Sequence, residues 1–475
     1  MEPRRRDSRN RLIRAASPGS GRAMVLGPYL RRRTAGRGRS GPQPSERPPA
    51  ARLDEAVGLA RAIDLEVVQA GLVPVSDIRP ATYLGKGKVD EIAGIAKTLE
   101  VDLVVMDCAV SPVQQRNLEK AWNTKVLDRT GLILEIFGER AHTREGALQV
   151  EHAHLSYQKS RLVRSWTHLE RQRGGFGFLG GPGETQLEAD RRIIEERIAR
   201  IEAELEGVKR TRRLHRASRK RVPYPIVALV GYTNAGKSTL FNKLTRANVL
   251  EADMPFATLD PTLRALALPE GTKAIMSDTV GFISDLPTML VAAFRATLEE
   301  VMEADVILHV RDVAHGEAEA QAKDVEKVLR ELDVDPDDHG RLVEAWNKID
   351  LLHPERRIEI ANLASRTSAD SRPVLVSAVT GEGTDALLAA IEARVAAHRQ
   401  IFDLVLDPAD GAGMGWLYRH TQVVAKSVRD DGRLAFTVRV DPEKAEMVQR
   451  KFEVAAETNS DRSFRGAPKA RTRNP

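Results

Sequence analysis

The stretch that decides the fold reads Gly-Tyr-Thr-Asn-Ala-Gly-Lys-Ser and spans residues 231–238. It follows the apolar segment 226–230, which predicts a buried strand, and it opens a segment with helical periodicity. This order is typical of a phosphate-binding loop, in which backbone amides at a helix N-terminus surround phosphate oxygens. Lys237 can reach the terminal phosphates, and Ser238 can offer its hydroxyl to Mg²⁺. The predicted contacts are Gly231, Tyr232, Thr233, Asn234, Ala235, Gly236, Lys237 and Ser238.

A four-residue motif, Asp278-Thr279-Val280-Gly281, follows the short apolar strand expected at 274–276. An acid at the carboxyl end of a strand can face a bound Mg²⁺, and a glycine amide can approach the γ-phosphate. Such a quartet is common as a turn, so its weight comes from its position downstream of the phosphate loop. We therefore expect all four residues at the nucleotide.

The base is read by a third motif, Asn347-Lys348-Ile349-Asp350, which follows the strand expected at 342–346. A carboxylate at Asp350 can accept hydrogen bonds from both N1 and N2 of guanine. Adenine lacks that pair of donors and would leave the acid unsatisfied. Lys348 can lay its methylene stem along the purine, and Asn347 can tie this loop to the phosphate loop. The sequence therefore predicts GTP rather than ATP as the ligand.

A fourth element completes the nucleotide site and indicates the architecture. The strand expected at 374–376 leads into Ser377, Ala378 and Val379, where the backbone amide of Ser377-Ala378 can donate to guanine O6. Strands alternate with helical patterns through the segment 223–398. This alternation predicts an α/β fold with a doubly wound, mainly parallel sheet that binds its ligand at the carboxyl ends of the strands.

The rest of the chain divides by composition and periodicity. Residues 1–50 are rich in arginine, glycine and proline, and we expect them to be disordered. Leucines that recur every seven residues from Leu148, and a second apolar stripe from Ile194, predict paired helices around a glycine-rich loop. The C-terminal pattern of strand, helix, two strands and helix predicts a small ferredoxin-like α+β domain. The predicted boundaries are 1–50 for a disordered basic extension, 51–145 for an N-terminal α/β subdomain, 146–222 for the helical hairpin, 223–398 for the GTP-binding domain, 399–454 for the C-terminal domain and 455–475 for a disordered tail.

Composition sets outer limits on the function. The chain has 475 residues, a formal net charge of +6 and one cysteine, Cys108. The positive charge permits an RNA partner, and a single cysteine excludes an internal disulfide. No apolar run is long enough for a membrane-spanning helix, so we expect a cytoplasmic protein without an integral membrane segment. The arginine-rich, acid-poor start leaves open a mitochondrial transit peptide and a matrix location.

Further stretches carry a family resemblance. They are Tyr83-Leu84-Gly85-Lys86-Gly87-Lys88, Ser111-Pro112, Gln114-Gln115-Arg116-Asn117-Leu118-Glu119, Gly181-Pro182-Gly183-Glu184-Thr185-Gln186-Leu187-Glu188, Phe256-Ala257-Thr258-Leu259-Asp260-Pro261-Thr262 and Asp278-Thr279-Val280-Gly281-Phe282-Ile283. With the nucleotide motifs, they resemble the HflX family within the Obg-HflX group of translation-associated GTPases. The resemblance implies that Thr258 joins Mg²⁺ and senses the γ-phosphate, so Ser238 and Thr258 are the expected metal ligands. The nucleotide contacts that it implies are Phe256, Ala257, Thr258, Leu259 and Asp260.

The resemblance also implies a partner. Members of the family bind the large ribosomal subunit and its rRNA, and they split or rescue stalled ribosomes under stress, with the glycine loop, residues 174–183 here, reaching toward the peptidyl-transferase region. Phe282 stands where Ras-like enzymes place a water-positioning glutamine, and an apolar side chain cannot orient water. We therefore expect a slow GTPase, monomeric and stimulated by the ribosome. The sequence assigns no catalytic residue.

Two other functions stay open at this point. The chain can be a GTPase that assembles the large subunit, which would prefer immature precursors to mature subunits. It can also be an RNA-binding scaffold that holds GTP as a structural ligand, because Phe282 replaces the glutamine. Stimulation of GTP turnover by a ribosomal particle separates the scaffold from both enzymes.

Overall fold

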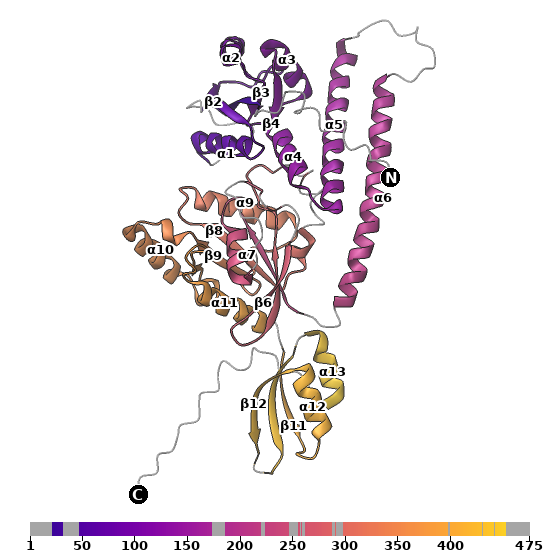
Figure 1. Ribbon diagram of the computed structural model, residues 1–475, viewed down its shortest axis with the longest axis vertical. Helices are drawn as coiled ribbons and strands as arrows, with labels where there is room; N and C mark the ends of the chain where they lie inside the picture. The colour runs from indigo at the N-terminus through magenta and orange to yellow at the C-terminus, as the bar shows by residue number, and fades with distance from the viewer. Residues whose placement is uncertain are drawn as a thin grey trace, which may run out of the picture. The chain divides into compact units, whose positions relative to one another are not determined.

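In the computed structural model the chain forms two compact units (Figure 1). The first contains residues 1–267 and 273–384, and the second contains residues 268–272 and 385–475. The structure describes residues 21–31, 47–172, 186–219, 224–246, 255–256, 258, 262–286, 290, 298–397, 400–429, 431–440 and 442–452. Within these ranges, no helix is both long enough and apolar enough to cross a membrane.

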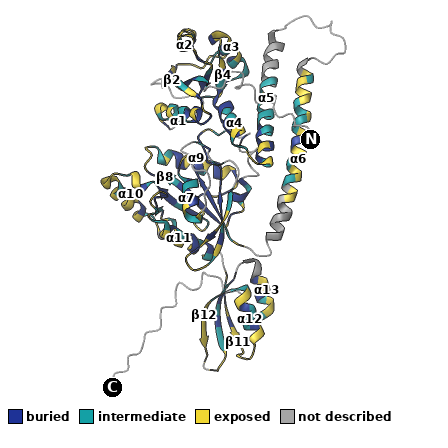
Figure 2. Ribbon diagram, in the orientation of Figure 1, coloured by how far each residue is buried: buried dark blue, intermediate teal, exposed yellow. Residues whose placement is uncertain are grey.

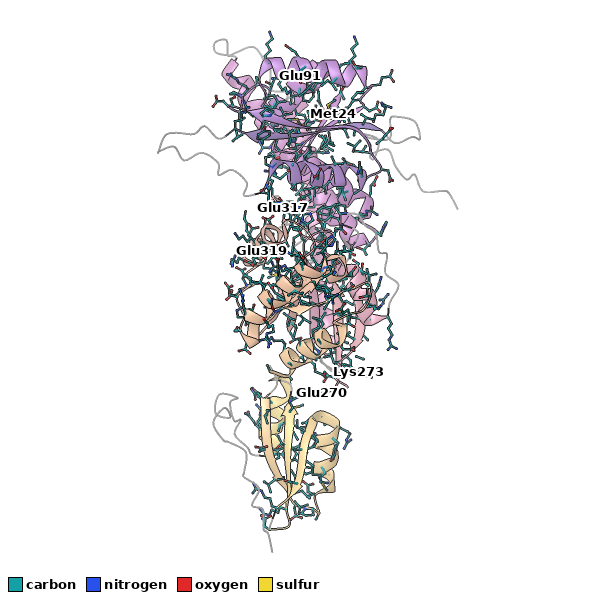
Figure 3. All side chains as sticks on the ribbon, turned by 90° about the vertical axis from the view of Figure 1, so that its left-hand side faces the viewer. Met24, Glu91, Glu270, Lys273, Glu317 and Glu319 are labelled. Atoms are coloured by element: carbon teal, nitrogen blue, oxygen red, sulfur yellow. The ribbon has the colours of Figure 1, made fainter. Side chains whose placement is uncertain are left out.

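The first sheet has four parallel strands in the order β2-β1-β3-β4. They are β1 (Arg22–Leu30), β2 (Glu66–Val75), β3 (Leu103–Met106) and β4 (Lys125–Asp128). The prediction that residues 1–50 are disordered is wrong for β1, which lies inside this sheet. Met24 and Val25 are buried there, so the short apolar run outweighs the arginine-rich composition around it (Figure 3).

Four helices complete this part of the first unit. They are α1 (Pro49–Arg61), α2 (Lys86–Thr98), α3 (Pro112–Trp122) and α4 (Arg129–Arg140). Ser111 starts α3 through a capping box with Gln114, in which each side chain binds the other residue's amide. Asp128 starts α4 because its Oδ1 accepts the Gly131 amide at 2.8 Å. The α/β fold expected from residue 51 onward thus begins earlier, at β1.

Two long helices, α5 (Arg144–Gln172) and α6 (Gln186–Arg219), form the predicted hairpin (Figure 1). They lie side by side, and ion pairs such as Arg197 with Glu151, at 2.8 Å, join them. Much of their described surface is exposed or half-buried (Figure 2). The glycine loop 174–183 lies outside the described residues.

The second sheet carries the nucleotide motifs. Its order is β10-β9-β8-β5-β7-β6, and every neighbouring pair is parallel except β6 with β7. The mainly parallel sheet is therefore confirmed, with an antiparallel edge strand that the sequence did not predict. The strands are β5 (Ile226–Gly231), β6 (Thr262–Ala267), β7 (Lys273–Asp278), β8 (Val306–Asp312), β9 (Leu342–Asn347) and β10 (Val374–Leu375). The helices are α7 (Lys237–Thr245), α9 (Ala318–Glu331) and α10 (Pro354–Arg366), with 3-10 turns η1 (Ile349–Leu351) and η2 (Ala369–Ser371).

The second unit holds the small C-terminal fold. Its strands β11 (Gln400–Leu406), β12 (Gln422–Val428) and β13 (Leu434–Val440) form an antiparallel sheet in the order β11-β13-β12. Its helices are α11 (Thr384–Ala397), α12 (Gly411–His420) and α13 (Pro442–Phe452). Phe402, Leu404, Phe436 and Val438 alternate along two strands and form the core. The strand and helix order of the ferredoxin-like prediction is therefore present, and this unit also takes in α11, which precedes the boundary predicted at 399.

Candidate nucleotide-binding site

The phosphate loop connects β5 to α7, as predicted. Lys237 is buried at the first position of α7. Its Nζ donates to the carbonyl oxygens of Gly231 at 3.1 Å and Tyr232 at 2.7 Å. Burial lowers the pKa of Lys237 to about 8, because a buried ammonium loses hydration. A ligand with negative phosphates would compensate that loss, so the loop is built to receive an anion.

Asn347 joins three of the predicted motifs. Its Nδ2 donates to the Ala235 carbonyl oxygen at 2.9 Å, and its Oδ1 accepts the Ala378 amide at 3.0 Å. Gly236 has φ +88°, and a Cβ there would lie 2.3 Å from Asn347 Nδ2, so this approach requires glycine. The amide of Ala378, at the position where we expect a contact with guanine O6, donates to Asn347 Oδ1. Val379 follows it and is 72% exposed at the loop surface.

Three oxygen-bearing side chains meet beside the phosphate loop. Ser238 Oγ and Thr258 Oγ1 each lie 2.8 Å from Asp278 Oδ2, and they are 2.9 Å from each other. Asp278 is fully buried, and burial raises the pKa of its carboxyl group. Among the described residues, its second oxygen, Oδ1, has no hydrogen-bond partner.

Hydroxyl and carboxylate oxygens are the ligands that Mg²⁺ prefers. The cluster of Ser238, Thr258 and Asp278 fits that ion, and the unpartnered buried carboxylate oxygen supports the fit because a nearby cation or its water would satisfy it. Ser238 lies in the first turn of α7 and Thr258 in a separate loop, so they can hold an ion only while that loop lies close to the start of α7.

The guanine-reading motif turns around η1. Asp350 is exposed in this turn, whereas Ile349 is buried beneath it. Lys348 has φ +67°, and its Nζ lies 2.8 Å from Asp312 Oδ2. This pair directs the lysine stem, and Asp350 stays open to a base. The sequence interpretation missed Asp312, although an acid at the end of a strand, here β8, is the same signal that identified Asp278.

The segment after the Asp278–Gly281 quartet lies against the phosphate loop. The Thr233 amide donates to the Phe282 carbonyl at 2.8 Å, and the Phe282 amide donates to the Gly231 carbonyl at 3.1 Å. A Cβ on Gly281 would lie 3.0 Å from Lys237 Nζ, so glycine permits this close packing. Phe282 itself is buried. Any approach to the γ-phosphate here therefore comes from backbone groups.

Most of the predicted residues are thus brought to one edge of the sheet. Thr279 hydrogen-bonds the Leu229 carbonyl and Val280 is buried behind the quartet. Asn234 is exposed at the tip of the phosphate loop, and Ser377 is buried and accepts the Thr380 amide at 3.1 Å. Ala257, Leu259 and Asp260 lie outside the described residues.

Family models match the chain over most of its length. They are described as GTP-binding GTPase N-terminal (residues 50–138), GTP-binding GTPase Middle Region (140–219), 50S ribosome-binding GTPase (226–348) and HflX C-terminal domain (362–462).

Curated relatives called GTPase HflX are similar along the same length. The protein of Magnetococcus marinus is 52% identical over 372 residues, which cover 78% of this chain and 84% of the relative. The protein of Escherichia coli is 42% identical over 391 residues, covering 82% and 89%. A solved structure of a GTP-binding protein from Sulfolobus solfataricus in complex with GDP is 21% identical with a TM-score of 0.41, covering 79% of this chain and 98% of that chain.

Proposed function

The chain belongs to the HflX family and is a GTPase, and from this premise we propose that it acts on the large ribosomal subunit. In this proposal GTP and Mg²⁺ order the nucleotide site, the ordered form holds the subunit, and hydrolysis releases it. The contact of Thr258 with Ser238 and Asp278 carries the proposal. A threonine from a separate loop beside these two residues supports the proposal, because such a loop would respond to a bound γ-phosphate.

The site residues take distinct roles in the proposed reaction. Lys237 and the amides of the phosphate loop bind the phosphates, and Asp350 selects guanine. Ser238 and Thr258 would hold Mg²⁺, with Asp278 behind them. When bound, the ion would neutralise negative charge on the phosphate oxygens.

A stimulating partner is proposed because Phe282 stands at the position of the water-positioning glutamine and cannot orient water. Phe282 occupies the place after Gly281 and is buried. The basal reaction should therefore be slow, and a surface that orders the loops should accelerate it. The match of residues 226–348 to a 50S ribosome-binding GTPase model supports the large subunit as that surface.

The finer proposal is that the protein splits or rescues stalled ribosomes under stress. Its support is the hairpin, because α6 has 34 residues and is roughly 50 Å long at the rise of an α-helix. An arm of this length can carry the loop 174–183 deep into an RNA particle. The protein would then act as a monomer in the cytoplasm, where ribosomes are found.

GTP turnover with and without large subunits, at several salt concentrations, tests this function, with Lys237→Ala as the blank. We expect a low basal rate that mature subunits raise and that salt suppresses, because contacts with RNA phosphates are screened. Deletion of residues 174–183 should preserve nucleotide binding and abolish ribosome splitting in a density gradient. Stimulation by immature precursors alone would indicate an assembly factor, and no stimulation by any particle would refute the ribosomal role.

A further inference from the structure

The hairpin of β6 and β7 runs from the first compact unit into the second and back. Its strands belong to the first unit, whereas its turn, residues 268–272, belongs to the second. The Leu268 amide donates to the Thr272 carbonyl at 2.9 Å, and the Gly271 amide donates to the Leu268 carbonyl at 3.0 Å. Pro269 fixes one backbone angle, and Gly271 has φ +85°. The turn therefore has a defined shape that another element can hold.

A buried carboxylate of the second unit binds this turn. Glu392 lies on α11 and is 5% exposed, and its Oε2 accepts the Glu270 amide at 2.8 Å. On β13, Arg439 Nη1 lies 3.7 Å from Glu270 Oε2, which is a weaker contact because the Glu270 side chain is largely exposed (Figure 3). Leu268, at the start of the turn, is buried. The tip of the hairpin is therefore held at a backbone amide and at side chains.

Glu392 is an expensive residue for a purely structural contact. Among the described residues, its second carboxylate oxygen, Oε1, has no hydrogen-bond partner. A buried polar atom left unpaired costs free energy, and an apolar side chain of similar volume is often neutral or stabilising in its place. Glu270 is exposed, so water could bond its amide if Glu392 were absent. Stability of the fold alone does not account for this acid, whereas a restraint on the turn would.

The other end of the hairpin lies at the proposed magnesium cluster. β6 and β7 form six consecutive antiparallel pairs, which end at Thr262 with Asp278. Six strand residues span about 20 Å. Thr258, which lies four positions before Thr262, contacts Asp278 Oδ2 at 2.8 Å. Because paired strands move together, the position of the turn affects where β6 begins, and therefore how close Thr258 can lie to Asp278.

We propose that Glu392 is a positioning residue for the nucleotide site, which holds the β6–β7 hairpin where Thr258 can reach Asp278. It acts through the turn and the two paired strands. This role rests on the proposed magnesium position and does not depend on ribosome binding. It gives the C-terminal unit a part in nucleotide recognition.

GTP and GDP should respond differently when this restraint is lost. Thr258 is the proposed ligand that depends on the γ-phosphate, so a loosened hairpin should weaken the binding of GTP with Mg²⁺. Lys237 and Asp350 lie on other elements and act on both nucleotides, so the affinity for GDP should be kept. By linkage, GTP would stabilise the contact of Glu392 with the turn by the same factor. A partner that binds the second unit and alters this contact would therefore change the preference for GTP.

Titration of the full chain with a non-hydrolysable GTP analogue and with GDP, each with Mg²⁺ and with a chelator, tests this role. We expect Glu392→Leu to weaken binding of the analogue with Mg²⁺ about fivefold or more, and that of GDP by less than about twofold. Its melting temperature should not fall, because leucine removes the unpaired buried oxygen. Glu392→Gln keeps an acceptor for the Glu270 amide and should retain the affinities of the parent.

Gly271→Ala changes the same turn without altering α11. Alanine is strained at φ +85°, so this variant should also weaken the analogue more than GDP, and it serves if Glu392→Leu does not fold. Asp410→Ala is the matched control, because Asp410 Oδ1 accepts the Gly413 amide at 2.7 Å at the start of α12 in the same unit. It should lower the melting temperature and leave both affinities within about twofold of the parent.

Failure of this role and failure of the proposed magnesium position give different results. A parent that binds the analogue equally well with Mg²⁺ and with a chelator would refute the ion position, and the role of Glu392 with it. A parent with a clear Mg²⁺ effect that Glu392→Leu and Gly271→Ala both keep in full would overturn the role of Glu392 alone. So would equal losses for the analogue and GDP in Glu392→Leu, or a loss in Asp410→Ala as large as that in Glu392→Leu.

Discussion

Asn347 Nδ2 donates to the carbonyl oxygen of Ala235 at 2.9 Å, which ties the guanine-reading loop to the phosphate loop. The other end of the same side chain accepts the Ala378 amide. One buried amide therefore sets the spacing between the part of the site that binds the base and the part that binds phosphates. GTP must span that spacing, so the contact belongs to recognition as well as to folding.

Asn347→Asp should weaken GDP and GTP binding together. The carboxylate keeps the shape of the side chain but turns the donor at Ala235 into an acceptor, which leaves two oxygens facing each other. A buried mismatch of this kind costs about 1–3 kcal/mol, or roughly 10- to 100-fold in affinity. Fluorescent-nucleotide titration measures it. An affinity equal to that of the parent would show that the bridge is dispensable.

Asp350→Asn should change the preferred base. The amide offers one donor and one acceptor where guanine needs two acceptors, so GTP affinity should fall roughly 10- to 100-fold, given the strength of hydrogen bonds to charged groups. Xanthosine triphosphate carries a carbonyl at C2 in place of the amine, so it should gain affinity. Competition between the two nucleotides is the measurement. Equal losses for both would mean that Asp350 does not face the base.

Nucleotide binding should take up a proton near pH 8. Lys237 in the free protein has a pKa of about 8, lowered by burial, and bound phosphates would raise it again. Below about pH 7 the lysine is charged in both states and affinity is flat; as pH rises through 8, only the bound form keeps the proton and affinity falls. Calorimetric titration of GDP in two buffers with different ionisation enthalpies should show uptake at pH 8 and almost none at pH 6.5. Identical heats in the two buffers at pH 8 would contradict this.

Asp278→Asn should uncouple GTP binding from Mg²⁺. The amide would no longer orient Ser238 and Thr258 through a charged acceptor, and loss of such supporting groups lowers metal affinity roughly 10- to 100-fold. The parent should bind GTP more tightly with Mg²⁺ than with a chelator, and the variant should show little difference. Asp305→Asn is the control, because Asp305 accepts the Ile226 amide at the start of β5, away from this cluster. A full magnesium effect in Asp278→Asn would exclude the proposed ion position.

The nucleotide motifs could be predicted from the sequence because each one is a short run of residues directly after a strand. Its side chains and backbone have the donors, acceptors or charge that a nucleotide requires. The predicted roles of Asp350 at the base and of Lys237 at the phosphates follow from their charge and from the turns in which they lie. The parallel sheet then brings the ends of the preceding strands to one edge. The sequence interpretation failed at β1, since composition averaged over residues 1–50 hid a short apolar strand among arginines. It also did not predict the hydrogen bond from the Ala378 amide to Asn347, because that contact joins the ends of two separate strands.

By itself, the sequence determined that this chain carries a mainly parallel α/β domain with a phosphate-loop motif, and it predicted an acid that selects guanine. Only the tertiary structure decided which residues hold those parts together. Arg47 and Tyr232 are 185 positions apart, and neither has a local pattern that marks it as one half of a contact. Motifs act through their own backbone and chemistry, whereas a buried polar network exists only when folding brings its members within hydrogen-bond distance and removes water from between them.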